Sequence, residues 1–213
     1  MNISFAITTH NEGECIDRLL FQLQEYIEGN NTSDEIIILD DFSEDPDTVN
    51  ILDRYSNLSY VQLHQRKLNR NFANHKNYLN SLCSNDYIFQ IDADEYLISE
   101  LLENLESILN DNHNIDLFFI PRINTVEGLT EEHINMWGWS VNEYGWVLYP
   151  DYQSRIFRNT EDIMWVGQVH ERIQGHTSYA MLPAEERFSI IHEKTISKQE
   201  EQNSFYSDIL QQD

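Results

Sequence analysis

The first hundred residues alternate between short apolar segments and longer segments with helical periodicity, and this alternation restricts the fold more than any other feature. Residues 3–8, 35–39, 60–63 and 87–91 are rich in β-branched or aromatic side chains, as is typical of buried strands. Apolar residues at helical spacing predict helices over 16–27, 46–55, 72–82 and 101–109. Gly29 is expected to end the first helix. Buried strands joined by helical crossovers predict an α/β fold with a Rossmann-like, doubly wound, mostly parallel sheet.

The pattern changes after about residue 112. A strand is predicted over 117–120, ended by Pro121, and further strands over 153–157 and 188–192. Residues 130–170 are rich in Trp, Tyr and Gly and show no long helical periodicity, whereas 197–210 reads as a polar helix. We therefore expect one domain over 1–213, with halves 1–111 and 112–194, a mixed C-terminal extension of the sheet and a C-terminal helix over 195–213.

Polar residues gather where the predicted parallel strands end. Ligands bind beyond the carboxyl ends of such strands, so residues from separate stretches of sequence should converge on one edge of the sheet. The residues that follow these strand ends are Thr8, Thr9, Asn11, Asp40, Asp41, Asp92, Asp94 and Glu95.

Asp92 and Asp94 flank a single residue, so an extended backbone places both carboxylates on one side. Two such groups can hold a hard divalent ion and leave positions for water and phosphate oxygens. The alternative is a solvated strand end that caps the next helix. A helix–loop–helix calcium site is excluded, because Tyr96 and Leu97 occupy its fifth and sixth positions and a strand precedes it.

Composition excludes several classes of function. The net charge of −24, from 37 acidic and 13 basic side chains, disfavours a long groove on nucleic acid. Two cysteines provide no disulfide framework, and the chain shows no signal peptide, no span of roughly 18 apolar residues and no glycine-rich phosphate loop. A cytoplasmic protein without stable membrane insertion is expected.

Four cations in the segment 66–76 could bind phosphate or form a solvated helix face.

Five motifs in order resemble the family 2 glycosyltransferases of GT-A fold, over about residues 3–192. They are ITTHNE, ILDDFSED, LNRNFANHKN, IFQIDADE and RIFRN followed by MWVGQVHERI. The resemblance implies a GT-A fold with a nucleotide-sugar-binding half over 1–111 and an acceptor-side half over 112–194. It also implies inverting transfer of one sugar from a nucleotide-diphosphate sugar, with uridine the commonest base, to an acceptor hydroxyl.

The resemblance also assigns expected roles to residues of this chain. Asp94 would bind Mn²⁺ or Mg²⁺, with His192 as a further metal-site residue and Asp92 at the ribose or a metal-bound water. Arg70 or Lys76 would lie near the base or the diphosphate. The residues expected around the base and ribose are Thr8, Thr9, Asn11, Glu12, Asp40 and Asp41.

The acceptor side is less specified. Glu171, in WVGQVHE, is the expected catalytic base and should be partly buried, with Asp151 in YPDYQSRIFR as the second candidate. Residues 137–146 are a candidate lid. The acceptor could be a glycan, a protein or a modified DNA base, and the net charge lowers the last option without removing it. A nucleotidyltransferase-like or non-catalytic nucleotide-sugar-binding protein is the alternative function.

Overall fold

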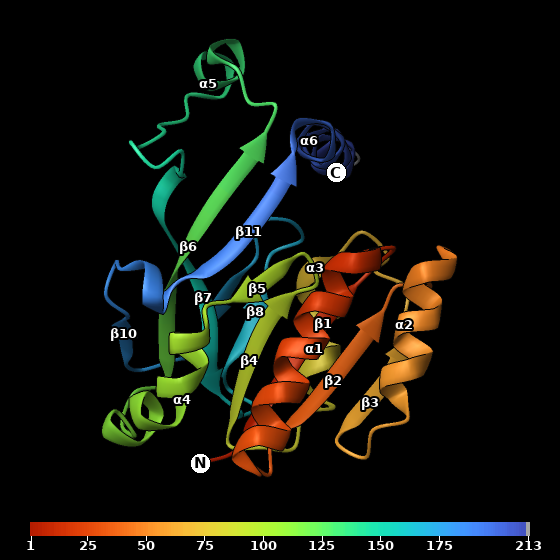
Figure 1. The fold of residues 1–213 in the computed structure, drawn as a ribbon, viewed down its shortest axis with the longest axis vertical. Coiled ribbons are helices and arrows are strands. Elements are labelled where there is room, and N and C mark those ends of the chain that lie inside the picture. The colour runs from red at the N-terminus through yellow and green to blue at the C-terminus, as the bar shows by residue number, and fades with distance from the viewer. Residues whose placement is uncertain (212–213) are drawn as a thin grey trace.

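One path of hydrogen-bonded strands runs through the molecule in this computed structural model, which describes residues 1–211 (Figure 1). The strand order is β3-β2-β1-β4-β7-β6-β11-β5, and β10 pairs with β6. The strands of this sheet are β1 (Ile3–Thr9), β2 (Glu35–Asp40), β3 (Val61–Gln65), β4 (Tyr87–Asp92), β5 (Glu95–Leu97), β6 (Leu117–Glu127), β7 (Val147–Arg158), β10 (Tyr179–Met181) and β11 (Ile190–Thr195). A separate hairpin contains β8 (Met164–Val166) and β9 (Arg172–Gln174).

The direction of the strands changes between the two predicted halves. β1 pairs in parallel with β2 and β4, and β2 with β3, as predicted. β7 then pairs antiparallel with both β4 and β6, so the second half extends the same sheet as a mixed one. The sheet therefore continues from one half into the other, which brings the carboxyl end of β4 next to side chains of β7.

Alternating side chains explain why both faces of the parallel part are covered. Phe5 and Ile7 belong to the core beneath α1 (Gly13–Asn30), α2 (Pro46–Ser56) and α4 (Ser99–Asp111), whereas Ala6 packs in the second core with α3 (Phe72–Asn80). Figure 1 shows α1 and α2 in front of the strands and α3 behind them. The doubly wound arrangement predicted from the sequence is confirmed.

The first helix does not stop where glycine predicted. It continues through Gly29 to Asn30, and Asn31 takes the left-handed conformation at φ 49° that ends it. Asparagine tolerates this conformation better than most residues because its short amide can hydrogen-bond locally. Gly29 was therefore the wrong stop signal, although the predicted helix is present.

One expectation for the second half is also wrong. Pro121 does not end its strand, because β10 pairs with residues 117–119 of β6 and β11 with residues 122–127, so the ladder on that edge is already interrupted at Pro121. The aromatic region contains no long helix but a short one, α5 (Glu131–Trp137), which Thr130 and His133 begin with a capping box. The C-terminal helix is α6 (Ile196–Leu210), and residues 212–213 of the predicted helix lie outside the described residues.

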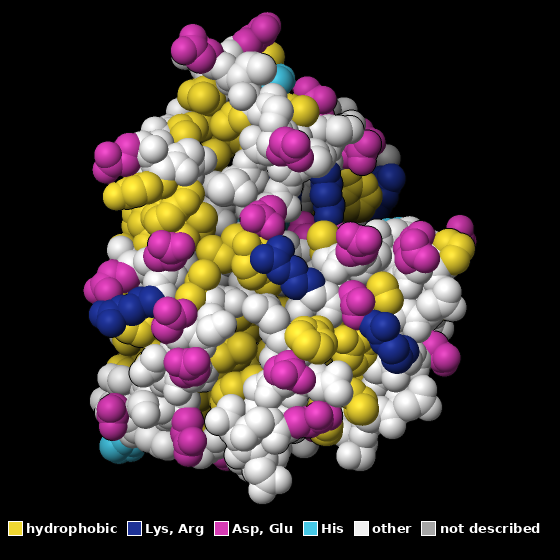
Figure 2. Space-filling view, in the orientation of Figure 1, with side chains coloured by type: hydrophobic (Ala, Val, Ile, Leu, Met, Phe, Trp, Pro, Cys, Tyr) yellow, Lys and Arg dark blue, Asp and Glu magenta, His cyan; other side chains and the backbone are white. Residues whose placement is uncertain are grey.

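The visible surface carries the acidic charge of the sequence. Figure 2 shows Asp and Glu spread over most of this face, with hydrophobic side chains gathered around α5 and the start of β7. Within residues 1–211, no helix combines the length and apolar character that crossing a bilayer requires.

Candidate functional site

A cleft of about 790 Å³ lies at the carboxyl ends of the parallel strands. The pairing of Thr8 with Asp92 and of Thr9 with Asp40 brings three strand ends to the same level. The second half and α6 form the opposite wall, so one cleft collects side chains from most of the chain. Its lining includes Thr8, Thr9, Glu12, Asp41, Lys76, Asp92, Asp94, Arg122, Asp151, Arg155, Glu171, His192 and Lys194.

A buried arginine from β7 neutralises the acidic strand end. Arg155 is 2% exposed, and its Nη2 lies 2.7 Å from Asp92 Oδ2 and also contacts Glu95 Oε1. Glu95 is 1% exposed and receives a second guanidinium, Arg122, at 3.1 Å. Burial alone would raise the pKa of Asp92, but Arg155 and Lys76 lower it well below its usual range. These contacts offset the repulsion between neighbouring carboxylates.

Lys76 connects this network to the expected catalytic base. Its Nζ lies 3.4 Å from Asp92 Oδ1 and 2.7 Å from Glu171 Oε1, and 4.8 Å from the ring centroid of Trp165. Burial would lower the pKa of Lys76, but Asp92 and Glu171 raise it above its usual value, so the side chain stays charged. Both oxygens of Asp92 therefore face protein cations, and its expected contact with a metal or ribose stays a prediction.

Asp94 and His192 meet on the other side of the strand end. Asp94 Oδ2 lies 3.2 Å from His192 Nε2, and His192 Nδ1 lies 2.9 Å from Asn124 Oδ1. The amide of Asn124 is oriented by its Nδ2, which donates to Asp151 at 2.9 Å, so Oδ1 faces the histidine as an acceptor. Nδ1 therefore donates to Asn124 Oδ1, and Nε2 faces the carboxylate of Asp94.

This donor pair fits a divalent cation. Nε2 and the carboxylate oxygen are both ligands that divalent cations accept, and the hydrogen bond from Nδ1 is the usual support of a metal-binding histidine. Burial would raise the pKa of Asp94, whereas His192 and Lys198 lower it below its usual range. No third His, Cys, Asp or Glu completes a metal-binding group within residues 1–211, so phosphate and water oxygens would supply the other ligands.

The residues expected around the nucleotide divide into two groups. Thr8, Thr9, Glu12 and Asp41 line the cleft. Asp40 instead accepts hydrogen bonds from Ser43 N, Ser43 Oγ and Gln65 Nε2. Asn11 Oδ1 accepts from Glu44 N and Asp45 N at 2.8 and 2.9 Å.

Asn11, Asp40 and Arg70 are not among the described residues that line the cleft. The first two shape the loops that carry lining residues, and Arg70 lies just before α3 with φ 57°. The direct nucleotide contacts expected of these three residues stay predictions.

The two candidate bases differ in their partners. Asp151 Oδ2 accepts from Arg122 Nε at 2.9 Å and from Asn124, and Oδ1 accepts from Gln153 at 2.8 Å. Burial would raise the pKa of Asp151, but Arg122 and these hydrogen bonds lower it, which weakens the carboxylate as a proton acceptor. The Glu171 side chain is 14% exposed, as expected for a partly buried base, and lies in the cleft beside Lys76. Both carboxylates pair with a cation, so the choice of Glu171 as the base stays a prediction.

Several important residues were not predicted from the sequence. Arg155 follows Ser154 and precedes two buried residues, Ile156 and Phe157, so a charge within an apolar strand was the available signal. The helix α6 gave no such signal, because Ile209 is its one buried residue in the described chain. Its residues that line the cleft are Gln199, Gln202, Asn203 and Tyr206, and Lys198 contacts two lining residues, Glu12 and Asp94.

An aromatic arm, defined as residues 130–149, projects beyond β6 and β7 (Figure 1). Ring centroids lie 4.6 Å apart for Trp137 and Trp139 and 5.1 Å apart for Tyr144 and Trp146. Trp139 reaches the cleft lining. The arm therefore connects an exposed aromatic surface to the cleft, and its predicted action as a lid stays a prediction.

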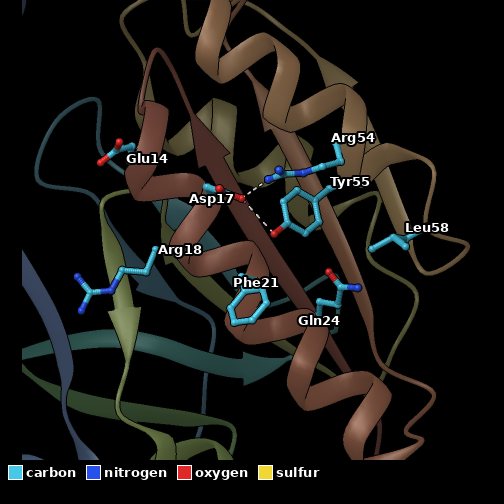
Figure 3. Close-up of a pocket in the computed structure, with 8 residues that line it drawn as sticks. All are labelled: Glu14, Asp17, Arg18, Phe21, Gln24, Arg54, Tyr55 and Leu58. Atoms are coloured by element: carbon cyan, nitrogen blue, oxygen red, sulfur yellow. Dashed lines mark hydrogen bonds and ion pairs between the residues drawn. The ribbon is translucent and has the colours of Figure 1, made fainter.

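A second hollow of about 690 Å³ lies on the outer side of α1 and α2 (Figure 3). Arg54 and Tyr55 both point to Asp17, and Tyr55 donates to it at 3.1 Å. Its lining shares no described residue with the cleft at the strand ends, and its paired charges leave no converging set of acids. Its side chains suit control substitutions, because none of them lines the cleft.

Comparison with known proteins gives a consistent family. The model of glycosyl transferase family 2 matches residues 4–188. Uncharacterized glycosyltransferases of Rickettsia conorii and Rickettsia felis are 32% and 35% identical over 121 residues, which are 57% of this chain and 38% of each relative. The matched segment thus spans well under half the length of these relatives.

Solved structures share the fold. S. aureus TarS 1–349 in complex with UDP-GlcNAc superimposes with a TM-score of 0.65 at 18% identity, over 91% of this chain and 59% of that one. The complex of the same protein with UDP gives a TM-score of 0.64 at 16% identity, over 98% and 65%.

We predict that Glu95→Gln lowers the free energy of unfolding by about 3 kcal/mol. The substitution leaves the buried guanidinium of Arg155 without one of its two carboxylate partners. The value lies at the low end for buried pairs, since Asp92 still contacts Arg155. The control is Glu193→Gln, whose exposed pair with Arg18 should contribute less than about 1 kcal/mol. Urea unfolding at pH 7 measures both changes. Equal effects would show that the buried network contributes no special stability.

Proposed function

The chain belongs to glycosyl transferase family 2 and has its GT-A fold, and on that premise we propose that it transfers one sugar from a nucleotide-diphosphate sugar to an acceptor hydroxyl, with inversion. The observation that carries this proposal is the meeting of Asp94, His192 and Glu171 in one cleft at the strand ends. The UDP and UDP-GlcNAc complexes of S. aureus TarS support a uridine nucleotide as the donor.

The proposed chemistry separates the leaving group from the acceptor. A Mn²⁺ or Mg²⁺ ion held by Asp94 and His192 would supply positive charge to the departing diphosphate. Lys76 fixes Glu171 through Oε1 at 2.7 Å, and we assign the other carboxylate oxygen to accept the proton of the attacking hydroxyl. Arg155 holds Asp92 and Glu95 in place, so the donor side is formed before a substrate binds.

The aromatic arm favours a glycan among the possible acceptors. Residues 130–149 contain no Lys or Arg, and every charged side chain present is acidic: Glu131, Glu132 and Glu143. Such a surface disfavours polyanions such as nucleic acid. Exposed Trp and Tyr rings instead offer flat apolar faces to sugar rings, with Tyr144 68% exposed. We therefore propose a hydroxyl on an uncharged saccharide as the acceptor.

Product analysis tests the reaction and the base together. With UDP-sugars and Mn²⁺, we expect release of UDP, and Glu171→Gln should lower kcat by about 10²–10⁴-fold with little change in donor KM. Asp151→Asn should retain most of the turnover, because its carboxylate is committed to Arg122 and Asn124. Release of pyrophosphate would indicate a nucleotidyltransferase, and nucleotide binding without product would indicate a binding protein.

Calorimetric titration tests the metal site without turnover. Wild-type protein should bind UDP about tenfold more tightly with Mn²⁺ than with chelator, a difference of about 1.4 kcal/mol, because an ion held by Asp94 would supply positive charge to the diphosphate. Asp94→Asn should abolish that difference. Asp17→Asn, in the outer hollow, is the control and should preserve it. A Mn²⁺ effect that survives in Asp94→Asn would remove Asp94 from the metal site.

Acceptor kinetics test the role of the arm. Trp139→Ala should raise the KM for neutral oligosaccharide acceptors by about tenfold, equivalent to about 1.4 kcal/mol of lost contact, and leave UDP affinity unchanged. Phe21→Ala removes another exposed ring, 56% exposed in the outer hollow, and should change neither value. An unchanged acceptor KM in Trp139→Ala, or preferred transfer to phosphate-bearing glycans, would contradict the saccharide surface.

A further inference from the structure

The first turn of α6 places a lysine beside the proposed metal pair. Lys198 Nζ donates to Glu12 Oε2 at 2.6 Å and lies 3.5 Å from Asp94 Oδ2, the same oxygen that faces His192. Thr195 begins the helix, and its side chain accepts from Lys198 N. The ammonium therefore stands at the edge of the site where a donor diphosphate would meet Asp94.

The cations at the cleft differ in how many carboxylates they contact and in how exposed they are. Among the described lining residues, Lys76, Arg122 and Arg155 each contact two carboxylates and are nearly or largely buried. Lys194 is turned to Gln202 of α6. The side chain of Lys198 is 41% exposed, compared with 7% for Lys76 and 3% for Arg155. The Lys198 ammonium is therefore more accessible to a ligand than those of Lys76 and Arg155 are.

Charge balance gives Lys198 a reason to change partners. Glu12 and Asp94 are both acidic and face the ammonium from two directions. A diphosphate arriving at this edge would face the same carboxylates and would be repelled unless cations intervene. A metal ion on Asp94 would take over that carboxylate, and the ammonium would then be available to phosphate oxygens at charge-assisted hydrogen-bond distance.

We propose that Lys198 is a diphosphate-binding residue of the donor site, which exchanges its contacts with Glu12 and Asp94 for phosphate oxygens when the nucleotide binds. This inference rests on the proposed function. The competing explanation is that Lys198 only anchors α6 to the loop after β1. An anchor would affect folding or all ligands alike, whereas a phosphate contact must distinguish a diphosphate from a monophosphate.

The test compares UDP with UMP by isothermal titration calorimetry, with Mg²⁺ and with EDTA. Lys198→Met keeps the aliphatic stem but removes the charge, and it should weaken UDP binding by about 10- to 100-fold while UMP changes less than about twofold. Lys198→Arg should keep the preference for UDP. The matched control is Arg54→Met in the outer hollow, which removes one positive charge far from the cleft lining and should change neither affinity.

Each outcome separates the inference from the proposed function. Equal losses for UDP and UMP, or no loss, would overturn the role of Lys198 while wild-type UDP binding still supports the donor site. Wild-type protein that binds none of UDP, ADP, GDP and CDP would overturn the proposed function and the inference with it. Thermal midpoints without ligand check folding, and if Lys198→Met and Lys198→Gln both fail to fold, the residue is an anchor and the inference is wrong.

Discussion

The contact between Arg155 and the carboxylates of Asp92 and Glu95 is the interaction on which the site depends. A parallel strand that ends in three acids would be repelled by its own charge, and β7 supplies the counter-charge from an antiparallel neighbour. Arg155 can contact Asp92 and Glu95 only because β7 continues the sheet beside β4. Assembly of the sheet and neutralisation of the acidic edge are therefore the same structural event, and neither half can form this edge alone.

The shared counter-charge gives each acid of the strand end a different environment. Glu95 is enclosed between two guanidinium groups, Asp92 faces Arg155 and Lys76, and Asp94 is turned toward His192 and Lys198. Two carboxylates are thus used to position cations, and one remains directed at exchangeable partners. Residues 93 and 94 form a turn between β4 and β5, so the prediction of an extended backbone with Asp92 and Asp94 on one side is wrong. This turn lets a short acidic motif combine a structural and a binding role.

Much of the parallel half could be predicted, because buried strands and amphipathic helices leave strong periodic signals. The Asp94–His192 pair was also expected, although only through family resemblance, since 98 residues separate them. Arg155 could not be found by periodicity, because its partner carboxylates become neighbours only after β7 pairs with β4. The contribution of α6 was equally hidden, since its cleft-facing residues are polar and resemble a solvated helix. Local spacing does not encode contacts made by sheet pairing.

The hydrogen bond between Glu12 and Lys198 spans 186 residues of sequence. During synthesis on the ribosome, the loop after β1 emerges long before α6, because 186 residues separate the two partners. The acidic edge therefore forms without this lysine at first, and the same holds for His192. The contact can form only after residue 198 has left the exit tunnel, so this edge of the cleft is completed late and in one step.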